Sequence, residues 1–440
     1  MASKPFENTN NILKDIQDKL KTIVPEQRFL FQNRLKMKPG KMVGNKYICA
    51  IEPNLEQAVT PGGNTRNAYT LRDANAGRID QLQITPYEAT NRAEIAKGML
   101  ESSEKGDVAY ANVGRNRSKS IVTALKMHQE IDYRYGQVKK AEFDSASNAT
   151  AITSGYSALT AVMDLQQYSI GMFAGMGNAP VEFFDSAGTQ IGGTGYFRRA
   201  VNWAVGTRTM LFEFELSADR DAVVSAAAGL EVWFEGERTG VATYDEKVGI
   251  DKIITTSTGT LFNVDLDAND LFRGNTLDVS ALTNKKMNFL MLMDALNIPI
   301  SLGLSGKTVN CHINAFSFPG FIDDEAALRR YQATGKAVNG FKALEFLEGD
   351  VTIKIIVDPL IKYGEALIYC EDDLERVGTH DVELDSFFYG NNQEGFIHQV
   401  PNKNAYEIRC SVDDAIYSEN PAGMVKISGI VATDSAYDGT

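Results

Sequence analysis

Residues 116–138, NRSKSIVTALKMHQEIDYRYGQV, are the stretch on which the fold prediction rests. Apolar side chains recur in it with the three- and four-residue spacing of one helix face. Asn116 or Ser118 can cap the start of such a helix, and Gly136 suits the left-handed residue just beyond its end. About twenty residues at ~1.5 Å each give a helix of roughly 30 Å. We predict that this helix is the central packing element, and that its packing face consists of Ile121, Leu125, Ile131 and Tyr135.

The composition is that of an ordinary globular protein. Its 440 residues, 43% hydrophobic and 23% charged, are enough for two or three domains with their own cores. The net charge of −13 argues against a general nucleic-acid-binding protein, which would normally carry a basic face. The polar start and the lack of any apolar run of about eighteen residues predict neither a signal peptide nor a membrane span. The cysteines are widely spaced, without a CxxC pair, which favours a reducing cytoplasm over a zinc knuckle or a disulfide framework; they are Cys49, Cys311, Cys370 and Cys410.

The N-terminal part of the chain changes character several times. Residues 8–24 have the pattern of a short amphipathic helix that Pro25 ends. Residues 27–82 show no sustained apolar period, and long structureless loops are uncommon inside compact domains. We therefore predict that this region is disordered or packs on a neighbouring chain. Residues 88–105 are predicted to form a helix, which Gly106 ends.

Beyond the long helix the pattern is mostly that of strands. Residues 145–155 are predicted to be a turn-like connector, and residues 172–240 contain short strands with glycine turns. The latter range is predicted to be a small β module inserted into a larger domain. The last two hundred residues mix strands with helices predicted at 285–296 and 323–332, which indicates an α+β domain with a strand-rich core.

No motif supports catalysis or cofactor binding. SLGLSGKT at 301–308 resembles a phosphate loop, but serine replaces its first glycine and a strand pattern follows it instead of a helix. The acidic runs at 267–270 and 371–375 lack the alternating ligands of a calcium loop, so solvated turns are favoured. The histidines are scattered, and satisfied or exposed side chains are favoured over metal ligands; they are His128, His312, His380 and His398. We predict no catalytic, cofactor-binding or metal-binding residues.

Several segments, taken together and in order, resemble the major capsid protein of tailed double-stranded DNA bacteriophages, which has the Hong Kong 97 fold. The segments are ITPYEATNRAEIAKG (84–98), YRYGQV (133–138), MFAGMGNAPVEFFDSAGTQ (172–190), TLFNVDLDANDLFRGN (260–275), VDPLIKYGEALIYCEDDLERVG (357–378) and YEIRCSVDDAIYSENPAGMVKISGI (406–430). Positions within them that match the family's pattern are Tyr135, Gly136, Phe272, Gly274, Asn275, Gly364, Arg376, Gly378, Arg409 and Pro421. The resemblance extends over about residues 80–430 and depends on the series rather than on one motif.

The resemblance implies an α+β Hong Kong 97-like fold with an inserted β domain. Its parts would be an N-terminal arm (1–35), an extended-loop region (36–83), the spine helix with the start of the peripheral domain (84–171), the inserted β domain (172–240), and the peripheral and axial domains (241–440). The family's large N-terminal scaffolding region has no counterpart in this sequence, which implies a separate scaffold protein.

The implied function is structural and not enzymatic. A major capsid protein assembles with itself into hexamers and pentamers, which form the icosahedral head around phage double-stranded DNA. The implied partners are other copies of the chain, a scaffold protein, a portal protein, possible cement or decoration proteins, and DNA contacted weakly and non-specifically, with no membrane and no cofactor. The implied location is the virion, assembled in the bacterial host cytoplasm.

Two other functions remain open at this point. A shell protein of a cellular nanocompartment would have the same fold but would enclose a cargo protein instead of DNA. A β-rich carbohydrate-binding protein would account for the strands and aromatic residues of the middle region, but it predicts a signal peptide and a compact monomer.

Overall fold

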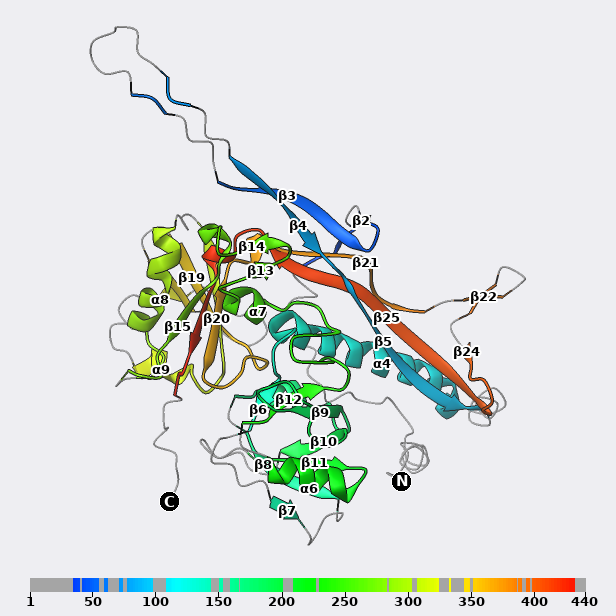
Figure 1. The fold of residues 1–440 in the computed structure, drawn as a ribbon. Helices are drawn as coiled ribbons and strands as arrows, with labels where there is room; N and C mark the ends of the chain where they lie inside the picture. The colour runs from blue at the N-terminus through cyan, green and yellow to red at the C-terminus, as the bar shows by residue number, and fades with distance from the viewer. Residues whose placement is uncertain are drawn as a thin grey trace.

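The structure is a computed structural model, and it describes residues 35–39, 42–54, 59–61, 71–73, 77–97, 108–143, 150–152, 159–165, 167–200, 209–226, 229–282, 285–302, 307–323, 332–333, 344–348, 351–385, 387–389, 393–395 and 398–431. Figure 1 shows an elongated molecule in which three larger sheets are arranged around one long helix, with a β-hairpin projecting from the body. That helix is α4 (Val108–Tyr135). The predicted long helix is thus confirmed, and it begins before the predicted start at 116.

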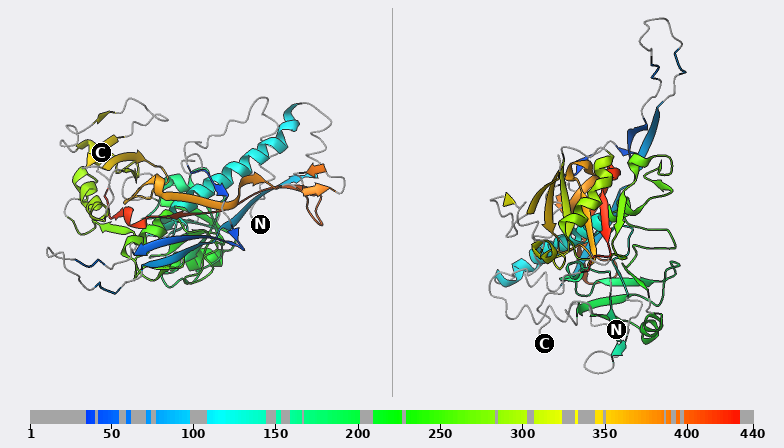
Figure 2. Two further views of the ribbon diagram at one scale, coloured as in Figure 1. Left: turned by 90° about the horizontal axis from the view of Figure 1, so that it is seen from above. Right: turned by 90° about the vertical axis from the view of Figure 1, so that its left-hand side faces the viewer.

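The first sheet, called here the long sheet, lies along α4 (Figures 1 and 2). Ile121 and Leu125 of α4 pack in one buried cluster with Ile95, Ile408 and Val412 of this sheet. The sheet is built around the fourteen-residue strand β25. Its strands are β1 (Lys38–Pro39), β5 (Tyr87–Ala96), β21 (Leu374–Leu384), β24 (His398–Gln399) and β25 (Ala405–Ser418).

The helix predicted at 88–105 is wrong, because this segment contains β5. All ten residues of β5 pair antiparallel with β25, from Ala405↔Ala96 to Asp414↔Tyr87. Ala89, Ala93 and Ile95, which alternate with polar residues, face the cluster under α4. A period of two is the period of a half-buried strand, and pairing with a strand three hundred residues away overrides local helix propensity.

The second sheet, called the module sheet, lies beyond the C-terminal end of α4 (Figure 1). Its strands, in spatial order, are β6 (Ala141–Glu142), β12 (Glu231–Phe234), β9 (Pro180–Phe184), β10 (Gly195–Ala200), β11 (Thr209–Phe214), β8 (Thr160–Asp164) and β7 (Thr150–Ile152). The short helices α5 (Ile170–Phe173) and α6 (Ser217–Ser225) belong to the same region.

Residues 172–240, predicted to be a separate β module, supply four strands of this sheet, but β6, β7 and β8 of the same sheet precede residue 172. The connector predicted at 145–155 contains β7, which pairs with β8. Phe183 and Phe212 lie in the same buried cluster as Ile131 and Tyr135 of α4. The hydrophobic core of the module therefore continues into the core of the main body.

The third sheet, called the mixed sheet, has both parallel and antiparallel pairs and its own buried cluster. Its strands, in spatial order, are β15 (Asn275–Asp278), β26 (Val425–Ser428), β20 (Glu365–Tyr369), β16 (Thr308–Ile313), β19 (Val351–Val357), β18 (Leu344–Glu348) and β17 (Gln332–Ala333). Helices α8 (Phe289–Ser301) and α9 (Pro319–Asp323) accompany it. The helix predicted at 285–296 thus starts later, at the residue after Asn288, whose side chain caps α8 by accepting a hydrogen bond from Met291 N at 2.8 Å.

A hairpin of β3 (Lys46–Asn54) and β4 (Arg78–Ile84), extended by β2 (Met42–Val43), projects away from the body (Figure 1). Residues 27–82 were predicted to be disordered or to pack on a neighbouring chain. Disorder is wrong for these strands, and packing on a neighbouring chain stays a prediction. The base of the hairpin is anchored because Leu82 and Ile84 are buried in the main cluster.

The remaining elements are short. They are α7 (Ile250–Thr255), β13 (Thr260–Leu261), β14 (Val264–Asp265), the 3₁₀ turns η2 (Asp270–Phe272), η3 (Glu371–Asp373) and η4 (Pro421–Gly423), and the pair β22 (Phe387–Tyr389) with β23 (Gln393–Gly395). The helix predicted at 8–24, residues 324–331 of the helix predicted at 323–332, and residues 303–306 of the phosphate-loop-like stretch fall outside the described residues. Within the described residues, no helix combines the length and apolar character needed to cross a membrane.

Candidate functional site: the charged junction at the end of helix α4

The C-terminal end of α4 is buried on all sides, although most of its residues are polar. Residues 129–136, QEIDYRYG, are all buried. The helix runs here into the region where the three sheets meet (Figure 1). Buried polar and charged groups are costly unless they are paired. We call this group of side chains, together with the partners described below, the junction.

The first set of partners joins α4 to the loops around the module sheet. Lys140 is fully buried, and its Nζ lies 2.8 Å from Glu246 Oε2 and 3.2 Å from Glu237 Oε2. It also lies 3.9 Å from Asp132 Oδ1. Burial raises the pKa of Glu237 to about 8 and the pKa of Glu246 to about 7, even though Lys140 opposes the shift. One lysine thus faces three carboxyl groups.

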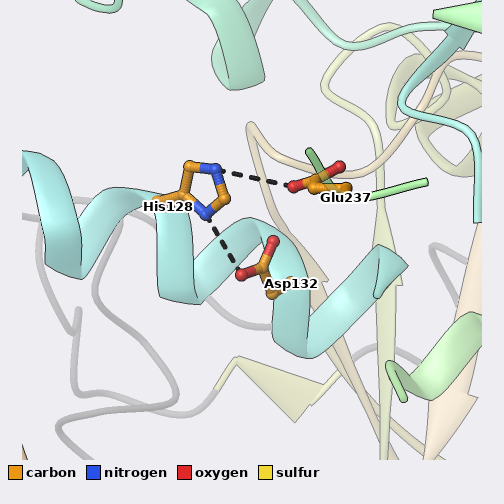
Figure 3. A group of neighbouring side chains, drawn as sticks. All are labelled: His128, Asp132 and Glu237. Carbon is orange, nitrogen blue, oxygen red and sulfur yellow. Dashed lines mark hydrogen bonds and ion pairs between the residues drawn. The ribbon is translucent and has the colours of Figure 1, made fainter. Parts of the chain in front are cut away.

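His128 adds a bridge at the rim of this set (Figure 3). Its Nδ1 lies 3.1 Å from Asp132 Oδ2, one turn further along α4, and its Nε2 lies 3.5 Å from Glu237 Oε1. Burial alone would lower the pKa of His128, but Asp132 outweighs it and the pKa is raised. The same pairing holds the pKa of Asp132 at about 2 against the effect of burial.

The second set of partners joins α4 to the long sheet and to the segment before α7. Asp414 of β25 contacts Lys247, Arg376 and the hydroxyl of Tyr133. The Lys247 Nζ also lies 4.1 Å from the centre of the Tyr133 ring. Burial would raise the pKa of Asp414, but Lys247 and Arg376 lower it. The carboxylate therefore stays charged inside the protein and joins three elements.

The third set of partners joins α4 to the mixed sheet. The Arg134 guanidinium lies between Glu130 of its own helix, at 2.8 Å, and Asp358 beyond β19, at 2.7 Å. Asp358 also faces His312 of β16 at 3.2 Å. Despite burial, Arg134 lowers the pKa of Asp358 well below its usual range.

The last helical residue, Tyr135, extends the contact with the mixed sheet. Its hydroxyl accepts a hydrogen bond from Lys362 N at 2.9 Å and donates to Glu365 at 3.3 Å. Glu365 is in turn 2.9 Å from Lys426, which also lies 2.7 Å from Asp251 of α7. One end of α4 thus fixes the long sheet, the module sheet and the mixed sheet relative to one another.

Gly136 permits this close packing. A side chain at Gly136 would place its Cβ 2.2 Å from Lys247 O, and a Cβ at Gly249 would lie 2.3 Å from Gly136 N. The two backbones are joined by a hydrogen bond from Gly249 N to Gly136 O of 3.0 Å. Any larger residue would separate α4 from the segment that carries Glu246 and Lys247.

The four residues predicted as the packing face of α4 are all buried, but they divide between two clusters. Ile121 and Leu125 pack on the long sheet. Ile131 and Tyr135 belong to the main cluster that continues into the module sheet. The helix therefore has two packing surfaces along its length.

Several of the predicted family-like positions lie where separate parts of the chain meet. Phe272 is buried, and the Asn275 side chain donates to Ala422 O at 2.7 Å. This brings the segment around Gly274 against η4, which begins at Pro421. Gly364, with φ of +81°, occupies a turn in which a side chain would be strained.

Three further predicted positions, Arg376, Gly378 and Arg409, lie in the long sheet. Arg376 is buried in the junction, whereas Arg409 is on the solvent side of β25, directly opposite Arg92 of β5. A Cβ at Gly378 would lie 2.1 Å from Asp413 O, so β21 and β25 approach each other there as only glycine allows.

Most of the junction could not be predicted from local sequence patterns. His128, predicted to be a satisfied or exposed side chain rather than a metal ligand, contacts two carboxyl groups. The four-residue spacing of His128 and Asp132 on one helix face was a signal available in the sequence. Glu237, Glu246 and Lys247 lie more than a hundred residues further on, and no local pattern connects them to α4.

Comparison with solved structures shows which known proteins share this fold. No family model matches the chain, and no curated protein matches it. Among solved structures, the capsid asymmetric unit of cyanophage A-1(L) is similar with a TM-score of 0.51 and 8% identity, over 94% of this chain and 95% of that chain. The chain therefore has an α+β capsid fold, and the resemblance to capsid proteins is confirmed at the level of the fold.

Two further structures are more distant. Gordonia phage Cozz matches with a TM-score of 0.43 and 11% identity, over 94% of this chain and 89% of that chain. The holo-SrpI encapsulin complex from Synechococcus elongatus PCC 7942 matches with a TM-score of 0.40 and 7% identity, over 98% of each chain. Scores of this size do not discriminate between a phage capsid and a cellular compartment.

Proposed function

We propose that the protein is the major capsid protein of a tailed double-stranded DNA bacteriophage, a structural protein and not an enzyme. It would assemble into hexamers and pentamers that form an icosahedral head. The observation that carries the proposal is the likeness to the cyanophage capsid subunit over almost the whole of both chains. If the two proteins shared only one domain, the match would cover only part of each chain.

The distribution of apolar side chains supports self-assembly. Along the projecting hairpin and the residues at its far end, four large apolar side chains are 63–77% exposed; they are Val43, Val59, Leu71 and Ile79. On α8, Leu290 and Ile298 are also more than half exposed. An exposed apolar strand edge is a liability for a monomer, whereas a neighbouring subunit would cover it.

The parts of the Hong Kong 97 fold can be assigned to elements within this proposal. Residues 1–35 would be the N-terminal arm, and the hairpin β3–β4 would belong to the extended loop (36–83). Helix α4 would be the spine helix and, with the long sheet, would form the peripheral domain. The mixed sheet would form the axial domain, and the module sheet would be the inserted β domain predicted at 172–240.

The proposal also extends to partners and location. The subunit would assemble in the host cytoplasm with a scaffold protein and a portal, and possible cement or decoration proteins would bind the finished head. The net charge of −13 supports only weak, non-specific contact with packaged DNA. The mature location would be the virion.

Electron microscopy of the expressed full-length protein tests the proposal. We expect closed shells or tubes built from hexameric and pentameric units. Monodisperse monomers under every assembly condition would contradict it. Shells that consistently purify with one cargo protein and contain no DNA would instead identify a nanocompartment.

A further inference from the structure

The side chains of His128, Asp132 and Glu237 form a compact set of metal-ligating groups. His128 and Asp132 are one turn apart on α4, and Glu237 comes from the turn after β12 (Figure 3). One ligand atom from each of the three residues lies within 4.8 Å of the others. The set is independent of the surfaces on which the proposed capsid function depends.

The surrounding charges leave this set with an excess of negative charge. Asp132, Glu237 and Glu246 bring three carboxyl groups, and Lys140 is the cation between them. Lys247, another buried lysine of the junction, is engaged by Asp414. Metal binding would displace the protons of Glu237, Glu246 and His128. The three carboxylates and Lys140 would then carry a formal charge of −2 beside a neutral imidazole, which a single divalent cation would balance.

Two buried oxygen atoms face the same space without hydrogen bonds. Asp132 and Glu237 are only 4% and 5% exposed, yet Asp132 Oδ1 and Glu237 Oε1 form no hydrogen bond with any described residue. Lys140 and the Phe234 N–H group contact the other oxygen of Glu237, Oε2. Among the described residues, each of the two oxygens that lack hydrogen bonds has only a long ion-pair contact, with Lys140 Nζ 3.9 Å from Asp132 Oδ1 and His128 Nε2 3.5 Å from Glu237 Oε1. A buried oxygen without a hydrogen bond is costly, and an ion that coordinated it would remove that cost.

His128 is the member of the set that reaches a cleft, whereas Asp132 and Glu237 lie buried behind it. The His128 side chain is 31% exposed and lines a cleft of about 640 Å³. The cleft lies between α4, β5, residues 175–180 and the end of β12. Its mostly apolar wall includes Leu125, Met127 and Phe234. An ion could enter through this cleft, and water in the cleft could complete its coordination shell.

We propose that His128, Asp132 and Glu237 form a binding site for one divalent first-row transition metal ion, most suitably Zn²⁺. One imidazole nitrogen and two carboxylate oxygens are ligands that Zn²⁺, Co²⁺ and Mn²⁺ accept, whereas Ca²⁺ and Mg²⁺ prefer oxygen ligands throughout. The imidazole bridges the two carboxyl groups, and coordination would replace one of these contacts with a metal bond. The ion would tie α4 to the turn after β12.

Direct binding measurements on the full-length protein test the site. After dialysis against EDTA and removal of the chelator, titration with Zn²⁺ by calorimetry is expected to show one tight site per chain. Substitution with Co²⁺ is expected to give the visible absorption of a nitrogen- and oxygen-ligated ion. Bound metal should raise the melting temperature by mass action, and excess Mg²⁺ or Ca²⁺ should not displace it.

Variants decide whether the ion binds at these residues. His128→Asn and Glu237→Gln are each expected to weaken Zn²⁺ binding at least about tenfold, while His398→Asn in the distant strand β24 is the matched control. Melting curves in EDTA establish that each variant is folded. The proposal is overturned if the wild-type protein binds no Zn²⁺, if His128→Asn binds it as tightly as the wild type, or if the control loses binding instead.

Discussion

The junction and the projecting hairpin differ in which side chains they bury and which they expose. At the junction, charged residues are buried, and their ion pairs join separate parts of the chain. On the hairpin, apolar residues such as Ile79 face solvent. A soluble monomer would be expected to show the reverse distribution. We infer that the junction maintains the shape of the subunit, and we propose that a neighbouring subunit covers the apolar surface of the hairpin.

Buried charges are weak contributors to stability but strict determinants of geometry. Exchanging a buried ion pair for apolar residues is often neutral, whereas removing one partner leaves an uncompensated charge. An apolar contact tolerates small rotations, but the paired atoms of Arg134 and Asp358 fix both distance and direction. We infer that the junction fixes the angles between the three sheets, which a closed shell would require.

Removal of one junction partner should give the largest effect on the isolated subunit. Arg134→Ala leaves Glu130 and Asp358 buried without their shared cation. We expect a loss of about 3–5 kcal/mol in the free energy of unfolding, seen as a low soluble yield or a strongly lowered melting temperature. Arg92→Ala, which removes an arginine with a side chain 67% exposed, is the control and should change stability by less than about 0.5 kcal/mol. Equal stability of the two variants would show that the junction is not required for folding.

The packing of α4 on the long sheet should be the next most sensitive feature. Leu125→Asp places a carboxyl group in the cluster with Ile95 and Ile408, at the edge of the cleft. We expect a loss of about 2–4 kcal/mol, because the charge must be desolvated or protonated. Lys126→Asp, at the adjacent and less buried position, should leave the subunit folded. Chemical denaturation of both variants measures the difference, and a stable Leu125→Asp protein would exclude this helix face as the main contact.

The sequence revealed the apolar half of this architecture better than the charged half. The spacing of Ile121 and Leu125 predicted a helix and its buried face, because helical periodicity is local. Tyr133 and Asp414, which meet in the junction, are 281 residues apart, and nothing in either neighbourhood indicates the other. A similarly large separation explains why β5 was predicted to be a helix, because its partner strand β25 follows about three hundred residues later. The division of the chain into the domains of the Hong Kong 97 fold stays a prediction.

The acid–base behaviour of the junction should give a smaller, pH-dependent effect. Glu237 and Glu246 have pKa values of about 8 and about 7, against 4.5 for an ordinary glutamate. Between pH 4.5 and 8 these two groups hold more protons in the folded protein than in the unfolded chain, so their contribution to stability falls as pH rises. The raised pKa of His128 acts in the same direction above pH 6.5.

We expect the melting temperature in EDTA to fall between pH 5.5 and 8.5. Glu237→Gln removes one of the two titrating carboxyl groups and should flatten this dependence. The matched control is Glu215→Gln, an exposed glutamate at the end of β11, which should keep the wild-type slope. A melting temperature that rises over this range would contradict the assignment of Glu237 and Glu246.

The hairpin should give the smallest effect on the subunit and, under the proposed function, a large effect on assembly. Ile79 is 71% exposed on β4, so Ile79→Asp removes no buried contact and should change the free energy of unfolding by less than about 0.5 kcal/mol. If a neighbouring subunit covers this side chain, the same substitution places a charge in an apolar interface and should prevent closed particles. Leu216→Asp is the matched control, because Leu216 is 61% exposed beside α6, where aspartate is also a favourable helix cap.

Particle formation is measured by electron microscopy and sedimentation, and subunit stability by thermal melting. Normal particles from Ile79→Asp would show that the exposed apolar surface of the hairpin is not an assembly contact, whereas loss of particles in both variants would point to a general effect of added negative charge.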